Sequence, residues 1–349
     1  MRALASRLAR GTLARSLGLV VLAGLVLFVA TELLSAYQNL QLANGAYYFA
    51  ALAGLTVLTG LSGQISLGHG ALMAVGAYTV ALLIGNEHWP LAGALAAAVA
   101  VSVVIGVAVG AAASRLRGPY LAGATLAFAI GLPALANKYP STLGGENGLT
   151  INPPVVPSWL GSGFPLERWE AWIASIGALI VLFVLTNFLR SGYGRVFRAV
   201  RDDEIAASLC GLRVGRVQTL AFVLSAACAG LGGGLLAIVL QLASPGAFTL
   251  ELSLALLTAV VLGGLGSLTG AIWGAAVLVL LPGWTNDIAH SFSLSQKVSA
   301  NMPLAIYGVV LIVAMLLWPS GFQGGLRTLL ASARGHLARR ARPRVAVGE

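Results

Sequence analysis

Long runs of apolar residues separated by short polar joints dominate the sequence. Most runs hold about twenty residues, which is the length that a helix needs to cross a bilayer core of roughly 30 Å. They cover residues 17–34, 46–61, 66–84, 91–113, 120–136, 171–189, 217–242, 252–262, 268–281 and 304–318. The pattern predicts an all-α, polytopic membrane protein with about ten transmembrane helices.

Residues 250–284 form a mostly apolar stretch that the glycine string at 263–266 interrupts. As a single helix this stretch would be about 50 Å long, which exceeds one crossing. We therefore expect two helices, joined at the glycines. The basic start of the chain followed by residues 17–34 is also compatible with a cleaved signal peptide. That run is long enough to span, however, and no clear cleavage site follows it, so an uncleaved first helix is expected.

Basic residues predict the orientation, because short cytoplasmic loops hold Lys and Arg in excess. With ten crossings and both termini cytoplasmic, every Lys and Arg lies on the inner side except Lys138, Arg168 and Lys297. The predicted parts are a basic cytoplasmic N-terminus (1–16), a transmembrane domain (17–320) with an outer loop (138–170) and a cytoplasmic loop (190–216), and a basic cytoplasmic tail (321–349).

The composition excludes a water-soluble protein. Of 349 residues 58% are hydrophobic and 9% are charged, and the mean hydropathy is +0.89. The 44 glycines suit close packing between membrane helices. A net charge of +10 does not indicate nucleic-acid binding, because the arginines are scattered among the joints. Cys210 and Cys228 are expected at different depths, so neither a disulfide nor a metal site is predicted.

No catalytic centre is recognisable. Neither Lys138 nor Lys297 follows a glycine, so the chain lacks a phosphate-binding P-loop and any ATP hydrolysis requires another subunit. The string at 60–63 matches the Gly-x-Ser-Gly of rhomboid-type intramembrane proteases. The proton-accepting histidine of such an enzyme is missing, since His69 is too close in sequence and the other histidines fall in outer joints or the tail.

Intramembrane carboxylates, which ion-coupled secondary transporters use, are also scarce. The acidic residues Glu32, Glu87, Glu251 and Asp287 all fall near predicted outer helix ends. An ion-coupled secondary transporter is therefore the disfavoured alternative class.

The inner loop carries the most specific pattern. Its charged middle is predicted to form a short helix that ends at a glycine cap, Gly211. The helix keeps Ile205, Ala206, Ala207 and Leu209 together as a small apolar knob, which suits a groove in a partner protein. A charged helix resting on the membrane surface is the alternative.

This loop resembles the EAA-type coupling segment of ABC-importer permeases, and the chain resembles the LivM-like permeases of branched-chain amino-acid importers. The similar strings, in family order, are LSGQISLGHG (61–70), RGPY (117–120), TLAF (125–128), GGENGL (144–149), RAVRDDEIAA (198–207) and VLGGLGSLTG (261–270). The resemblance implies coupling to an ATPase through Arg201, Asp202, Glu204, Ala206, Ala207 and Gly211. One departure is Ala255, where many members carry an acidic residue.

The two glycine strings, 63–70 and 263–270, have two possible structures. They are either non-helical breaks at membrane depth, which are tolerated where they line a cavity or are buried in protein, or tight cytoplasmic turns. As breaks they predict a translocation pathway that includes Gln64, Ser66, His69, Thr125 and Ser267. As turns they would leave His69 simply bonded to a carbonyl group.

The resemblance also implies an assembly in the bacterial inner membrane. Its parts are a second permease subunit, two cytoplasmic ATPase subunits and an external substrate-binding protein, with membrane lipid around them and no nucleic acid. The implied substrates are branched-chain amino acids, and urea, amides or another small polar solute remain open. The outer loop is either a solvated connector or a docking surface for the external partner.

Overall fold

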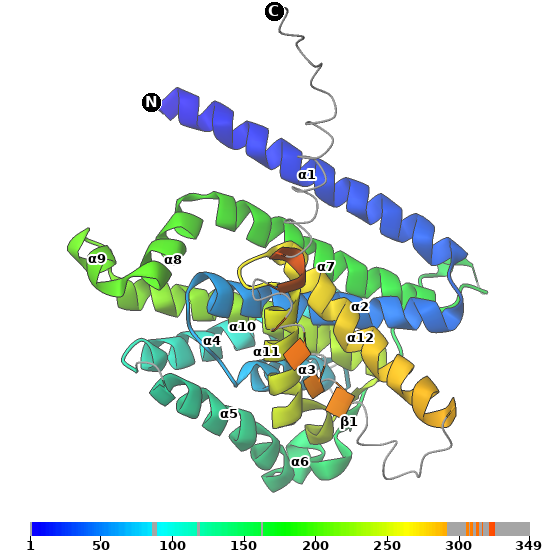
Figure 1. Cartoon of the computed structure of the whole chain (residues 1–349). Coiled ribbons are helices and arrows are strands. Elements are labelled where there is room, and N and C mark those ends of the chain that lie inside the picture. The colour runs from blue at the N-terminus through cyan, green and yellow to red at the C-terminus, as the bar shows by residue number, and fades with distance from the viewer. Residues whose placement is uncertain are drawn as a thin grey trace, which may run out of the picture.

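Figure 1 shows the computed structural model of the chain, which describes residues 2–85, 89–116, 119–161, 163–291, 305–306, 308–309, 312–313, 316 and 321–324. The longer helices are α1 (Arg2–Leu33), α2 (Ala36–Leu55), α3 (His69–Gly85), α4 (Leu91–Ala113), α5 (Pro119–Lys138), α7 (Leu166–Arg190), α8 (Gly192–Asp202), α10 (Val214–Leu240), α11 (Leu250–Gly263) and α12 (Leu268–Ser291). The short elements are α6 (Pro140–Leu143), α9 (Glu204–Leu209), β1 (Leu149–Thr150) and β2 (Leu242–Ala243), and a π-helical segment, Thr56–Leu61, continues α2.

Nine of the predicted apolar runs are helical, and the tenth, 304–318, lies largely outside the described residues. Six of the described helices are long and apolar enough to cross a membrane: Leu13–Leu33, Ala36–Leu61, Leu91–Ala113, Tyr120–Lys138, Leu166–Arg190 and Val214–Leu240. Three shorter apolar helices accompany them: His69–Gly85, Leu250–Gly263 and Leu268–Trp284. Residues 250–284 form two helices as predicted, and the basic N-terminal segment is helical and continuous with the first run.

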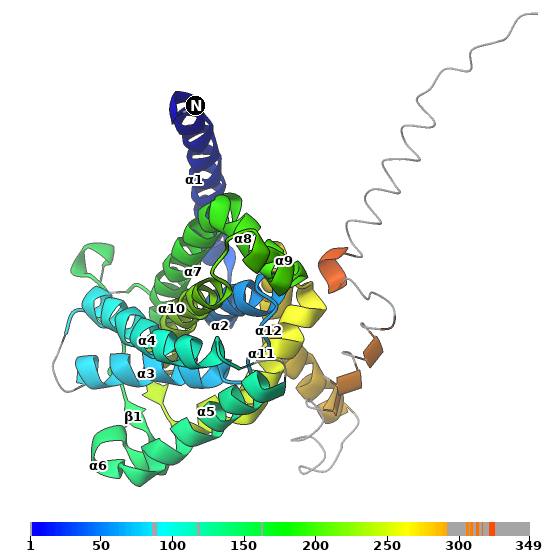
Figure 2. The ribbon, with the colours of Figure 1, turned by 90° about the vertical axis from the view of Figure 1, so that its left-hand side faces the viewer.

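Helix α10 occupies the middle of the bundle, where it packs against α2, α3, α4 and α7 (Figures 1 and 2). Glycines make the closest approaches. A Cβ atom on Gly233 would lie 2.5 Å from the carbonyl carbon of Met73, and one on Gly76 would lie 2.6 Å from that of Gly230. Side chains do not fit at such distances, so α3 and α10 pack backbone to backbone, as small residues allow in membranes.

The predicted outer loop closes one end of the bundle. Its strand β1 pairs antiparallel with β2, which follows α10, and the amide of Ile151 donates to the carbonyl oxygen of Gln241. This strand pair was not predicted and makes the protein nearly, rather than wholly, α-helical. At the same end an ion pair joins Glu32, from the end of α1, to Arg168 at the start of α7.

Glu170 corrects the boundary of that loop. The sequence placed it in the connector, whereas it lies inside α7 and is only 2% exposed. The amide of Gln241 donates a hydrogen bond of 3.2 Å to its carboxylate. This buried pair ties α7 to the end of α10, and it satisfies an acidic group that would otherwise be costly to bury.

The opposite end of the bundle carries α8 and α9, which project beyond the other helices (Figures 1 and 2). The segment 62–68, the end of α4 and the 264–267 turn lie on the same side, as the contacts described below show. The bundle therefore has a loop-rich end with the strand pair and a second end with the charged helical segment.

Candidate coupling and translocation site

Helices α8 and α9 are separate because Asp203 divides them. Its backbone is extended (φ −158°, ψ 108°), and its carboxylate accepts hydrogen bonds of 2.8 Å and 3.0 Å from the amides of Ile205 and Ala206. Asp203 thus ends α8 and caps α9, as acidic residues do at helix N-termini. The single short helix that the sequence predicted is therefore wrong in this detail.

The glycine cap at the end of α9 is confirmed. Gly211 adopts φ +83°, the amide of Gly211 bonds to the carbonyl of Ser208, and that of Leu212 bonds to the carbonyl of Ala207. This bond pattern is the Schellman motif, which requires a left-handed residue and favours glycine there. The cap fixes the direction in which the chain leaves α9 for α10.

The apolar knob on α9 is real, but one predicted member does not belong to it. Ile205 is 73% exposed and Leu209 is 83% exposed. The two residues are four positions apart, so they lie on the same face of the helix. Ala206 is exposed beside them. Ala207 is only 4% exposed. It follows Ile205 by two positions, which places it on the opposite side of the helix, where it packs into the protein. The exposed apolar face consists of Ile205, Ala206 and Leu209.

Arg201 connects this segment to the membrane helices. One guanidinium nitrogen donates a 2.9 Å hydrogen bond to the carbonyl oxygen of Gly60, at the end of the π-helical segment. The same side chain forms an ion pair with Asp202, at 2.8 Å. A Cβ atom on Gly63 would lie 2.9 Å from the Cγ of Arg201, so the arginine stem lies directly on the glycine backbone.

Glu204 makes a second connection. Its carboxylate accepts a 2.8 Å hydrogen bond from the side-chain amide of Gln218 in α10. The backbone carbonyl of Gln218 accepts a 3.3 Å hydrogen bond from the side-chain amide of Gln64. The same side-chain amide donates to the hydroxyl of Ser62 at 2.7 Å. The chain of contacts therefore runs from α9 through α10 to the segment 62–68. Gln218 was missed in the sequence, although an amide side chain inside an apolar run is a visible signal.

Most of the first glycine string (63–70) lies in segment 62–68, which is a non-helical break inside the bundle, and its last two residues begin α3. After it, α3 begins at His69, whose ring contacts the carbonyl oxygen of Ala51 at 2.8 Å and Ser225 at 3.4 Å. Ala51 lies ten residues before the end of the Ala36–Leu61 helix, and Ser225 eleven residues into α10. At 1.5 Å per residue, α3 therefore begins about 15 Å inside the bundle.

The second string is a tight turn. Helices α11 and α12 are separated by residues 264–267, and Cβ atoms on Gly263 or Gly270 would collide with the other's backbone. This turn lies against the π-helical segment that leads into the first string, since a Cβ on Gly60 would lie 2.8 Å from the Cα of Gly266. A Cβ on Gly321 would likewise lie 2.5 Å from the Cα of Gly264. The two strings thus meet beside Arg201.

The predicted pathway side chains are mostly turned inward. Gln64, Ser66, His69 and Thr125 are at most 5% exposed. Ser66 accepts a hydrogen bond from the amide of Gly68, and Thr125 accepts one of 3.0 Å from the amide of Leu67. The bond of His69 to a carbonyl is as the tight-turn alternative anticipated, although its ring sits deep in the bundle. These four side chains are buried within this chain and bond to its own groups.

The exposed positions of the first string are different ones. Along residues 62–66 burial alternates, so that Gly63 and Ile65 are exposed while their neighbours are buried, and Ile65 is 53% exposed. Such alternation is the pattern of an extended segment with one face covered. Ser267, the fifth predicted pathway residue, is half-buried in the second string and bonds to Thr269 at 2.8 Å. Gly63 and Ile65 are therefore the exposed residues of segment 62–66.

No metal centre can be built from the residues that the structure describes, because they contain no group of three His, Cys, Asp or Glu side chains able to hold a metal ion. Of the two cysteines, Cys210 is exposed and Cys228 is buried in α10. They lie in different environments, as the sequence predicted.

A bundle of membrane-length apolar helices is the architecture of a multi-pass membrane protein, and a non-helical break inside such a bundle is typical of transporters. Residues 36–315 match the family of the permease components of branched-chain amino acid transport systems. The chain belongs to this family.

Named relatives agree with this assignment. The chain is 33% identical to the high-affinity branched-chain amino acid transport system permease protein LivM of Salmonella typhimurium and to LivM of Escherichia coli, in each case over 87% of this chain and 74% of the relative. It is 28% identical to the permease protein LivH of Salmonella typhimurium, over 80% of this chain and 92% of the relative. No solved structure matched. The resemblance to LivM-like permeases is thereby confirmed, and the family is one of transport permeases rather than enzymes.

Proposed function

We propose that this chain is a transmembrane permease subunit of an ATP-binding-cassette importer in the bacterial inner membrane, and that it translocates branched-chain amino acids. The substrate follows from the relatives, whose names state branched-chain amino acid transport. The observation that carries the mechanism is the exposed α9 knob, which is linked by Arg201 and Glu204 to the break inside the bundle. A solvated surface helix would not need such links.

The proposed topology has ten crossings with both termini in the cytoplasm, a cytoplasmic N-terminus at 1–16, a permease domain at 17–320 and a cytoplasmic tail at 321–349. Two contacts support it. The pair between Glu32 and Arg168 holds two predicted outer residues together. The approach of Gly321 to Gly264 returns the chain, after the tenth run, to the end that carries α8 and α9. Assigning that end to the cytoplasm follows from its arginines.

The proposed assembly contains a second permease subunit, two cytoplasmic ATPase subunits and an external substrate-binding protein. Because the chain has no P-loop, ATP is hydrolysed by the partner subunits, and this chain requires no cofactor of its own. The outer loop, held by the β1–β2 pair, is the surface proposed to receive the binding protein.

Coupling is proposed to act through position rather than chemistry. Ile205 and Leu209 enter a groove of the ATPase, and closure of the ATPase pair moves α8 and α9. Arg201 passes the movement to Gly60, and Glu204 passes it through Gln218 to Gln64. The segment 62–68 then shifts between two packed arrangements and alters access for the solute.

Urea, amides and other small polar solutes remain candidates within the same family, because the two exposed residues of segment 62–66, Gly63 and Ile65, carry no group specific for an amino acid. An ion-coupled secondary transporter finds less support. Among the described residues, Glu170 is the acidic group that the structure buries most, and it is already bonded to Gln241 near the strand-paired end.

The test adds a charge to the knob. Ile205→Asp and Leu209→Asp should abolish binding-protein-dependent leucine uptake by the reconstituted complex, since an unpaired charge in a closed groove costs several kcal/mol. Ala199→Asp is the matched control, because it adds the same charge at an exposed position of α8 outside the knob. Membrane insertion should be unchanged in all three. Uptake by the knob variants at the level of the control would refute the coupling role.

A further inference from the structure

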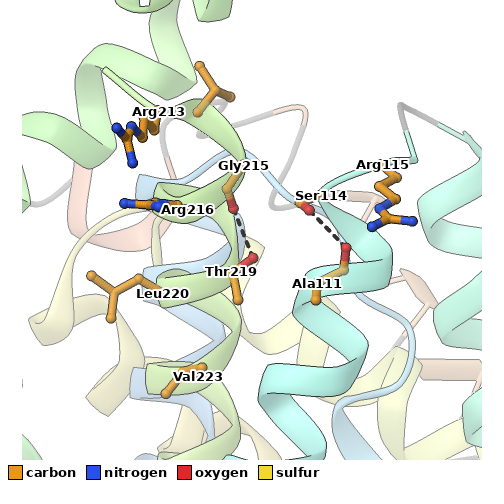
Figure 3. Close-up of a pocket in the computed structure, with 10 residues that line it drawn as sticks. Ala111, Ser114, Arg115, Arg213, Gly215, Arg216, Thr219, Leu220 and Val223 are labelled. Atoms are coloured by element: carbon orange, nitrogen blue, oxygen red, sulfur yellow. Dashed lines mark hydrogen bonds between the residues drawn. The ribbon is translucent and has the colours of Figure 1, made fainter. Parts of the chain in front are cut away.

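A cleft of about 630 Å³ lies between the end of α4 and the start of α10, apart from the coupling contacts (Figure 3). Two elements form its walls. Those from α4 and the residues after it are Ala111, Ser114 and Arg115, and those from the start of α10 are Arg213, Val214, Gly215, Arg216, Thr219, Leu220 and Val223. Figure 3 shows Arg115 on one side of the cleft and Arg213 with Arg216 on the other.

The rim of this cleft is strongly positive. Arg115, Arg213 and Arg216 are exposed, and no acidic residue lines the cleft. The two ion pairs found among the described residues, Glu32 with Arg168 and Arg201 with Asp202, do not involve them. The first turn of the 27-residue helix α10 adds backbone N–H groups and the positive end of its dipole. The rim therefore attracts an anion and has no neutralising partner in this part of the chain.

The floor of the cleft is apolar. Arg216, Leu220 and Val223 follow one another at helical spacings of four and three, and Figure 3 shows them on the same side of α10. The hydroxyls nearby are already engaged. Ser114 donates to the carbonyl of Ala111 and Thr219 to that of Gly215, each at 2.8 Å, and the Thr219 hydroxyl also lies 3.3 Å from the carbonyl oxygen of Gly110 in α4. The cleft thus changes from cationic at the helix ends to hydrocarbon one to two turns deeper.

We propose that this cleft binds an anionic phospholipid of the inner leaflet. The headgroup phosphate lies near Arg213 and Arg216, and one acyl chain lies along Leu220 and Val223 on the same side of α10, while Arg115 adds positive charge from the other side of the cleft. Basic pockets between membrane helices on the cytoplasmic side bind lipid headgroups by this combination of charge and depth. A free phosphate or a nucleotide would use the rim and leave the apolar floor exposed to water, so the lipid is the ligand that fits both parts. The proposal uses the inner-side orientation given above.

The experiment measures lipid binding to the purified transporter complex by native mass spectrometry, with dioleoyl-phosphatidylglycerol and dioleoyl-phosphatidylcholine as probes. The variant Arg115→Gln/Arg216→Gln should bind phosphatidylglycerol about thirty-fold more weakly. A ten-fold change in affinity corresponds to about 1.4 kcal/mol, so this loss corresponds to about 1 kcal/mol of binding free energy for each arginine. The control Arg195→Gln/Arg198→Gln removes the same charge from exposed positions of α8, outside the cleft, and should change binding less than two-fold.

Two further arms separate the possible ligands. Dihexanoyl-phosphatidylglycerol, with short chains, should bind at least ten-fold more weakly than the dioleoyl lipid, and millimolar inorganic phosphate should not displace the latter. Equal losses in both arginine pairs would reduce the effect to general surface charge and overturn the site. Displacement by inorganic phosphate would make it an anion site without a lipid. Binding by the isolated chain that is absent from the intact complex would show that a partner subunit covers the cleft instead.

Discussion

Replacing Gly60 by alanine tests the contact between the two glycine strings, because Gly60 lies just before the first string and packs on Gly266 of the second. A Cβ atom there would overlap the backbone nitrogen of Gly266 and lie 2.8 Å from its Cα. Both neighbours are backbone atoms, so no side chain can rotate away. The strings must separate by about 1 Å before ordinary contact distances of about 3.5 Å are restored. Overpacking of this kind costs about 1–3 kcal/mol of stability.

The same separation has a functional consequence, because Gly60 also holds the coupling segment. The bond from Arg201 to its carbonyl oxygen is 2.9 Å long, and a shift of about 1 Å takes it beyond hydrogen-bonding range. If this bond transmits the movement of α8, transport should fall by about five-fold or more, the lower end of typical coupling energies. Stimulation of the ATPase by the loaded binding protein should fall with it.

Gly45→Ala is the control, since it makes the same chemical change in the same helix, where a Cβ would meet nothing within 4 Å. Each variant is reconstituted with its partners, and leucine uptake, ATPase activity and thermal inactivation are measured together. Gly60→Ala should be less stable and poorly coupled, and Gly45→Ala should resemble the unchanged protein. Equal uptake and equal thermal inactivation in the two variants would refute both the contact and its role.

Two further predictions follow from the coupling loop and the topology. Gly211→Val should lower stability by about 1–2 kcal/mol and reduce uptake, because a β-branched residue is strained at φ +83° and the cap directs the chain into α10. Asparagine tolerates that conformation better, so Gly211→Asn should retain more stability and more uptake. Equal uptake in the two variants would contradict this explanation. The topology is tested in a chain from which Cys210 and Cys228 have been removed. A cysteine replacing Ser158 should react with an impermeant thiol reagent in intact cells, whereas one replacing Arg115 should react only after permeabilisation. Labelling of Arg115→Cys in intact cells would invert the topology.

The sequence by itself determined the class of this protein. Its apolar runs locate the long described helices, because crossing hydrocarbon demands about twenty apolar residues whatever the fold. The bounds agree less well, since α1 and α2 begin at Arg2 and Ala36, well before their runs. Local backbone features could be predicted from the sequence as well. The glycine cap at Gly211 depends on one residue and its own backbone, so the pattern identified it before any tertiary contact was known. Family membership also came from the strings themselves.

The tertiary structure decided which face of each segment is covered. Composition alone does not separate Ala207 from Ile205, yet one is 4% and the other 73% exposed, because α10 and α8 cover only one side of α9. The same holds for Gln64 and Ser66. Polar side chains in a membrane segment have to find partners, and these were found inward, on Ser62, Gln218 and the local backbone, which leaves Gly63 and Ile65 exposed.

Long-range pairings lay beyond the sequence for the same reason. Gly60 meets Gly266 and Arg201 meets Gly60 at one end of the bundle, and β1 meets β2 at the other, only because the fold brings the two distant members of each pair together. Each partner has many alternatives of similar chemistry in a chain with 44 glycines and 19 arginines. Apolar length is a property of one segment and can be read along the chain, whereas a contact is a property of two segments and depends on how all the helices between them pack.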